Sequence, residues 1–174
     1  MTRTILTYGL ISGAVIIVGM LISIKVNGGG LLVGYLIMLI AFSAILMGVK
    51  QHRDRALGGV IRFTTALLLG LGIALAASLA YVAIWEIYLA MTHYTFMDQY
   101  TGQMLAAKRA AGVTGAAYAK AIAQMDDMRR QYANPLYRLP ETFIEIFPVG
   151  VLVALVTAAL VRNPKFLPAR SRPV

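Results

Sequence analysis

Apolar residues in this chain are gathered into four long blocks separated by shorter polar stretches. Each block is close to the roughly 20 residues that an α-helix needs to cross the hydrocarbon core of a bilayer. None of the four contains an internal lysine, arginine or aspartate. The pattern therefore predicts four transmembrane helices, over residues 5–24, 31–49, 65–91 and 143–161.

The polar insertion between the third and fourth blocks, residues 92–138, has a helical periodicity. Gly112 and Gly115 interrupt the pattern, Thr114 is a suitable N-cap for a second helix, and Asn134-Pro135 would end that helix. We therefore expect two amphipathic helices that form a cap outside the membrane. Their apolar stripes either pack together or onto headgroups, or form a lid for a partner or ligand. The stripes consist of Phe96, Tyr100, Met104, Ala107 and Ala111, and of Tyr118, Ile122, Met125, Met128 and Tyr132.

Composition strengthens the membrane interpretation, because 59% of the residues are hydrophobic and only 13% are charged. Soluble domains carry about 25% charged residues. The predicted fold is an all-α membrane protein with one membrane domain, residues 1–162, and a basic tail, residues 163–174. Arg3 precedes an apolar run as in a signal peptide, but the run is long and has no Ala-x-Ala site, so we expect a retained helix.

The basic residues are unequally divided between the two sides of the predicted topology. One side holds nine basic residues and one acid, a net charge of +8, and the other holds seven basic and six acidic residues, a net charge of +1. Since basic residues accumulate on the cytoplasmic side, both termini are expected there, and the cap is expected in the periplasm. The positive charge then reflects anionic headgroups rather than nucleic acid.

Small residues predict how the helices pack, because they permit close backbone approach in lipid. Gly9-x-x-x-Gly13 and Ala44-x-x-x-Gly48 supply them on the first two helices, and two small-residue ridges on the third helix predict that it is central. The breaker cluster Asn27–Gly30 predicts an antiparallel hairpin of the first two helices. One such face could instead form a homo-oligomer.

Three glutamates near the outer ends of the spans are the leading candidates for chemistry. Glu141 follows Pro140, and the first turn of a helix is favourable for both residue types. Glu145 is one turn deeper, ahead of Pro148, which can kink the helix next to Gly150. Glu86 lies among aromatic residues at the outer end of the third block. If Glu86 and Glu145 face each other, they could hold a proton or a cation.

The alternative is that each glutamate is a satisfied interfacial residue, bonded to Tyr or Trp or paired with Lys25, Arg138 or an arginine of the cap. His93 could join Glu86 and Asp98 in a weak metal site, but three such residues are common by chance. We therefore expect no metal and no cofactor. The absence of cysteine removes disulfides, thiolate metal sites and cysteine nucleophiles.

The chain contains an ordered series of motifs. They are Tyr8-Gly9, Gly34-Tyr35, Gly48-Val-Lys-Gln-His-Arg-Asp54, Leu57-Gly-Gly-Val-Ile-Arg-Phe63, Ser78-Leu-Ala-Tyr81 with Trp85 and Tyr88, and Asn134-Pro-Leu136 with Glu145-Ile-Phe-Pro-Val-Gly150. Together they resemble the bacterial domain-of-unknown-function family 4199. The resemblance covers nearly the whole chain, to about residue 161, and implies a four-helix inner-membrane protein without an assigned activity. It marks Lys50, Arg53, Asp54, Glu145, Pro148 and Gly150 as candidates without giving them roles.

Three functions follow from these observations. A non-enzymatic scaffold or assembly subunit would bind a membrane or periplasmic protein through its adaptable Met- and Tyr-rich cap. A small proton- or cation-linked transport or ligand-binding protein would use Glu86 and Glu145. A lipid-headgroup enzyme ranks last, because no nucleophile or metal triad is evident in the sequence.

Overall fold

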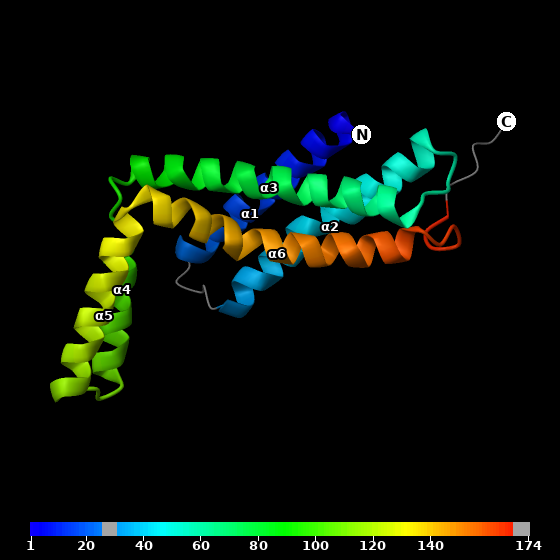
Figure 1. Cartoon of the computed structure of the whole chain (residues 1–174). Coiled ribbons are helices and arrows are strands. Elements are labelled where there is room, and N and C mark those ends of the chain that lie inside the picture. The colour runs from blue at the N-terminus through cyan, green and yellow to red at the C-terminus, as the bar shows by residue number, and fades with distance from the viewer. Residues whose placement is uncertain (26–30, 169–174) are drawn as a thin grey trace. The chain divides into compact units, whose positions relative to one another are not determined.

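A computed structural model describes residues 1–25 and 31–168 of the chain. Over these residues the protein is all-helical, which confirms the all-α part of the predicted fold class. The six helices in chain order are α1 (Thr2–Lys25), α2 (Leu31–Ala56), α3 (Phe63–Met91), α4 (Phe96–Ala110), α5 (Gly115–Ala133) and α6 (Pro135–Val161) (Figure 1). Four of them, α1, α2, α3 and α6, are long and apolar enough to cross a membrane.

Helix α2 continues seven residues beyond the predicted end at residue 49, through the polar stretch Lys50–Ala56. The connection expected there is therefore helix in its first half. Lys50 and Asp54 form an ion pair at a spacing of four residues, which favours helix over loop. The helix ends at Gly58 and Gly59, whose positive φ angles of 65° and 95° suit glycine and few other residues.

Helix α6 begins at Pro135, earlier than the expected start at Pro140. Asn134 is its N-cap, because the Asn134 side-chain oxygen accepts a hydrogen bond of 3.0 Å from the backbone N–H of Leu136. Pro135 then occupies the first helical position, where its missing N–H is no loss. Glu141 therefore lies in the second turn, and its expected first-turn stabilisation by the helix dipole was wrong.

The described helices divide into two compact units, and the first consists of residues 1–83 and 143–168. Within it, α3 packs against three helices at glycine contacts. A Cβ placed on Gly9 would lie 2.5 Å from Ala76 Cβ, and one on Gly70 would lie 2.9 Å from Ala154 Cβ. A Cβ on Gly48 would lie 2.9 Å from Ile73 Cδ1. Helix α2 likewise contacts three helices, α1 at Ser12, α3 at Gly48 and α6 at Gly150, so the third helix shares the predicted central position with α2.

Helices α1 and α2 pack along their length in an antiparallel sense. Ser12 donates a hydrogen bond of 2.9 Å to the Ala41 carbonyl, and Tyr8 donates one of 2.9 Å to Gln51 Oε1. From one pair to the other, the residue number rises along α1 and falls along α2, so the two helices are antiparallel, as the hairpin prediction requires. The expected loop Asn27–Gly30 lies outside the described residues.

The second unit, residues 84–142, contains the end of α3, the helices α4 and α5, and the first turns of α6. Helices α4 and α5 lie side by side (Figure 1). Helix α4 ends in a Schellman motif, in which Val113 N–H donates to the Lys108 carbonyl and Gly112 N–H to the Arg109 carbonyl. Gly112 has a φ of 80°, and Thr114 is the N-cap position of α5, without a side-chain cap bond.

The packed faces of α4 and α5 match the predicted stripes only in part, because Met125 is a stripe residue whereas Thr101 and Ala121 are not. Thr101 is buried on α4, and Ala121 and Met125 are buried on α5. Of the ten stripe residues, Tyr100 and Met128 are among those that remain exposed. Arg129 adds a polar link, because its Nε donates a hydrogen bond of 2.7 Å to the Thr101 hydroxyl between the helices. The contact between α4 and α5 therefore combines the buried stripe residue Met125 with a polar bond that the apolar pattern did not predict.

Candidate functional site

The strongest charged cluster of the second unit is built around Arg138, whose side chain is only 4% exposed. Its Nε and Nη2 donate hydrogen bonds of 2.7 Å each to the two carboxylate oxygens of Glu86. Its Nη1 donates one of 2.9 Å to the Tyr132 carbonyl. A two-pronged Arg–carboxylate pair of this kind is among the strongest and most directional contacts in proteins.

Aromatic side chains enclose the Arg138 guanidinium. Its central carbon lies 5.1 Å from the centre of the Tyr94 ring and 5.7 Å from that of Tyr132. The Tyr132 hydroxyl in turn accepts a hydrogen bond of 2.8 Å from the indole N–H of Trp85. The cluster thus links the end of α3, the end of α5 and the start of α6 through cation–π contacts and hydrogen bonds.

Local backbone structure positions these side chains. Helix α3 ends in a second Schellman motif, with Tyr94 N–H donating to the Leu89 carbonyl and His93 N–H to that of Ala90. His93 and Tyr94 consequently adopt positive φ angles of 51° and 57°, which are costly for residues with a Cβ. The turn directs Tyr94 onto Arg138, which stands in the first turn of α6 after the Asn134 cap.

Glu86 therefore has an ion-pair partner, as the interfacial alternative anticipated. Both of its carboxylate oxygens are bonded to Arg138, so its charge is balanced within the second unit. Sequence reasoning named Arg138 only as one of several possible partners. The signal was present, since Arg138 and Glu86 each stand at one end of a spanning block, but charge alone could not choose among the basic residues.

The remaining candidates of the fourth span lie on α6. Glu141 and Glu145 are exposed on the surface of their units, and Pro148 is exposed one turn further on. Glu145 belongs to the first unit and Glu86 to the second, so the facing pair of glutamates stays a prediction. Gly150 is a close-packing position, because a Cβ there would lie 2.8 Å from Ala74 Cβ and 3.0 Å from Phe42 Cζ.

A second charged cluster, in the first unit, brings together Lys50, Arg53 and Asp54. Arg53 is completely buried, and its Nε donates a hydrogen bond of 2.7 Å to Asp54 Oδ1. Lys50 pairs with the other oxygen of the same carboxylate. Three of the six residues that the motif resemblance singled out therefore form one hydrogen-bonded group.

The guanidinium of Arg53 also holds the segment that follows α6. Its Nη1 donates to the Phe166 carbonyl at 2.9 Å and makes a longer contact of 3.4 Å with the Val161 carbonyl, and its Nη2 donates to the Leu167 carbonyl. A helix end leaves its last carbonyls without partners within the helix, and a cation satisfies them well. Arg53 thereby joins the end of α2 to the end of α6.

Metal chemistry has no support in the described part of the chain. There, no group of three or more His, Cys, Asp or Glu residues is placed to hold a metal ion. The weak site considered for His93 with Glu86 and Asp98 is therefore not formed. Asp98 instead lies 3.3 Å from Arg129 Nε, within the α4–α5 contact.

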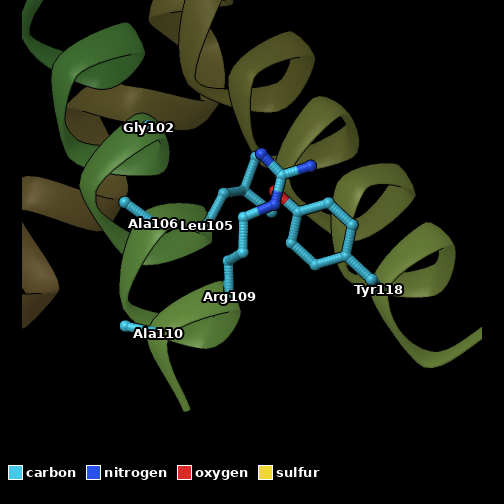
Figure 2. A pocket seen from close by; sticks show the side chains of 6 residues that line it. All are labelled: Gly102, Leu105, Ala106, Arg109, Ala110 and Tyr118. Atoms are coloured by element: carbon cyan, nitrogen blue, oxygen red, sulfur yellow. The ribbon is translucent and has the colours of Figure 1, made fainter. Parts of the chain in front are cut away.

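An open groove of about 580 Å³ lies between α4 and α5. Figure 2 shows Arg109 extending from α4 toward the ring of Tyr118 on α5, with Leu105 beside them. The guanidinium carbon of Arg109 is 5.1 Å from the centre of that ring. We call this feature the tip groove, and its lining residues are Gly102, Leu105, Ala106, Arg109, Ala110 and Tyr118.

Comparison with known proteins finds a matching family model. Residues 7–163 match the model of a family described as "Protein of unknown function (DUF4199)". No curated protein and no solved structure matches the chain. The matched range covers most of the chain and includes both charged clusters. The chain belongs to the DUF4199 family.

Proposed function

We propose that this protein is a non-enzymatic scaffold or assembly subunit of a bacterial inner membrane. Its partner, a membrane or periplasmic protein, would bind to the cap formed by α4 and α5. The observation that carries the proposal is a folded helical hairpin whose base is a neutralised charge cluster and whose apolar side chains are partly left uncovered.

The base of the cap is built for rigidity. Arg138 joins the structural segments on either side of the hairpin through Glu86 and Tyr132, and it is almost fully enclosed. Every buried side-chain nitrogen or oxygen in the described residues has a hydrogen-bond partner. Fully satisfied polar networks fix one conformation. Such a base supports a hairpin that presents a constant surface.

The uncovered apolar residues of the hairpin supply a contact surface. Tyr100, Ile122 and Met128 remain 43%, 39% and 37% exposed. Tyrosine and methionine are enriched at protein interfaces, because both combine large contact area with adaptable packing. A partner that covers these side chains would remove apolar area from water.

The proton- or cation-linked alternative is less well supported by the geometry. It requires Glu86 to accept a proton or a cation, and both Glu86 oxygens are engaged by Arg138. Releasing Glu86 would leave a buried arginine without its counter-charge, which is strongly unfavourable. In the scaffold proposal, the pair of Glu86 and Arg138 stays intact and stabilises the base of the cap.

The proposed orientation places both termini in the cytoplasm and the cap in the periplasm. Four spans return the chain to the side where it began, and the positive-inside rule assigns the +8 side to the cytoplasm. The exposed basic residues of that side, which include Arg55, Arg62 and Arg162, would contact anionic headgroups.

Site-specific photo-crosslinking in native membranes tests the partner proposal. A photoreactive amino acid at Tyr100 or at Met128 is expected to give one defined adduct of higher mass. The matched control is Gln131, an exposed polar position on α5. A proposal of partner binding would be contradicted if neither apolar position gave an adduct, or if Gln131 gave the same adducts with the same yield.

A further inference from the structure

Charge is unevenly distributed along the α4–α5 hairpin. Near its base, the acids Asp126 and Asp127 are paired with Arg129 and Arg130. The tip, residues 102–125, contains three cations and no acid. The tip therefore has a net charge of +3, in a segment whose remaining residues are mostly small or apolar. These cations are Lys108, Arg109 and Lys120.

The tip groove combines this charge with an apolar floor. Leu105, Ala106 and Ala110 line it along α4, and a Cβ on Gly102 would meet no atom within 4 Å. Its volume of about 580 Å³ is within the roughly 300–1,000 Å³ of small-molecule sites. The groove can thus accept an apolar group beside a cation.

Arg109 is held at the edge of the groove by an aromatic ring rather than by an acid. Its guanidinium carbon lies 5.1 Å from the centre of the Tyr118 ring, an arrangement that orients the planar group without neutralising it (Figure 2). The dipole of α4 favours Lys108 and Arg109 near the helix end. The helix dipole does not account for the absence of Asp and Glu from the facing part of α5, residues 115–125.

The tip is joined to a spanning helix by a short segment of chain. Only residues 92–95 separate α3 from α4, so the hairpin starts directly where a spanning helix ends. A helix of 15 residues such as α4 is only about 22 Å long. The tip therefore lies no further than about that distance from the root of the hairpin, where the bilayer surface offers phospholipid phosphates as anionic partners.

We propose that the tip groove binds the headgroup region of an anionic phospholipid. The phosphate would accept hydrogen bonds from the Arg109 guanidinium, and the apolar part of the lipid would lie over the groove floor. Lys108 and Lys120 add to the positive potential around the phosphate. The proposal is independent of partner binding through Tyr100 and Met128.

Hydrogen exchange of the full-length protein in lipid nanodiscs tests this assignment. Adding a minority of phosphatidylglycerol to phosphatidylcholine discs is expected to slow amide exchange in residues 102–120 several-fold. Arg109→Gln should abolish the slowing, and Arg109→Lys should retain only part of it, because lysine lacks the planar fork. Unchanged exchange in residues 126–133, the part of α5 outside the tip, reports that each variant is folded.

Arg130→Gln is the matched control, since it removes one exposed positive charge from α5 outside the tip. It is expected to keep the full phosphatidylglycerol effect. The proposal is overturned if Arg130→Gln weakens the effect as much as Arg109→Gln does, or if phosphatidylglycerol leaves exchange at the tip unchanged. Equal slowing by inorganic phosphate in pure phosphatidylcholine discs would assign the groove to a free oxyanion and overturn the lipid assignment.

Discussion

A buried arginine such as Arg138 is tolerated only when its donors and its charge are both satisfied. Glu86 satisfies two donors and the charge, and the Tyr132 carbonyl accepts from Nη1. Removing one partner of a buried pair leaves the other charge uncompensated, whereas removing both can be nearly neutral. This asymmetry distinguishes a structural pair from two independent surface residues.

We predict that Glu86→Gln destabilises the second unit by about 3–5 kcal/mol, because it leaves Arg138 buried without its counter-charge. The double variant Glu86→Met with Arg138→Met should recover much of that loss. Hydrogen exchange of residues 84–142 in nanodiscs measures both effects. Glu141→Gln is the control, because Glu141 is an exposed acid on α6, the helix that carries Arg138. If Glu86→Gln destabilised the unit no more than Glu141→Gln does, Glu86 and Arg138 would not be a structural pair.

Arg53 makes a comparable contribution at the other charged cluster. It is fully buried and donates to backbone carbonyls of the segment after α6. We predict that Arg53→Ala releases this segment and raises the rate of trypsin cleavage after Arg162 and Lys165 by at least tenfold, which corresponds to about 1.4 kcal/mol of lost local stability.

Arg55→Ala is the matched control for that experiment, because Arg55 is an exposed arginine two residues further along α2. Its substitution should leave the cleavage rate within about twofold of the wild type, as expected for exposed positions. Equal rates for Arg53→Ala and the unmodified protein would show that the carbonyl contacts do not hold the segment in place.

At the scale of single helices, the turn between α4 and α5 depends on a left-handed residue. Gly112 has a φ of 80° and donates its N–H to the Arg109 carbonyl. Gly112→Ala should destabilise the hairpin by about 1 kcal/mol, since a Cβ is unfavourable in this conformation. Gly102→Ala, inside α4 and facing open space, should be neutral or stabilising by about 0.5–1 kcal/mol.

Hydrogen exchange of the hairpin amides measures these two changes under the same conditions. The contrast isolates backbone conformation, because both substitutions add the same methyl group to the same helical hairpin. If Gly102→Ala were the more destabilising of the two, the left-handed turn would not be the feature that limits the stability of this element.

The helices themselves were predictable, because an apolar run of spanning length has few alternatives. Their ends were not. The second apolar block predicts a helix that ends at residue 49, whereas the ion pair between Lys50 and Asp54 favours its continuation through the polar residues Lys50–Ala56. Two prolines five residues apart, Pro135 and Pro140, offered two starts for α6, and the Asn134 cap selects the first. End positions depend on single hydrogen bonds that periodicity does not encode.

The pairing of charges was predictable only for residues that are close in sequence. Lys50, Arg53 and Asp54 are neighbours in sequence, so their grouping was foreseeable. Glu86 and Arg138 are 52 residues apart, and several basic residues competed as partners for the glutamate. Only the turn at His93 and Tyr94 and the N-cap at Asn134 bring the two side chains together. Composition identifies the charges, and tertiary structure decides their pairing.

For the whole molecule, the distribution of charge predicts which of the two possible orientations in the membrane the protein adopts. Nine basic residues and one acid lie on the side of both termini, against a net charge of +1 on the side of the cap. Four spans require the termini to share a side. We predict a cytoplasmic C-terminus. A fluorescent protein fused there should fluoresce, whereas alkaline phosphatase fused there should have no enzymatic activity.

The same reporters placed in the α4–α5 turn, after Val113, should behave in the opposite way, because phosphatase folds only outside the cytoplasm. A fusion in the turn after α2, at Gly58, supplies the control for a cytoplasmic loop and should match the C-terminal fusion. Phosphatase activity at the C-terminus together with fluorescence at Val113 would indicate the inverted insertion. The basic tip of the hairpin would then face the cytoplasmic leaflet, and the partner of the cap would have to be sought there.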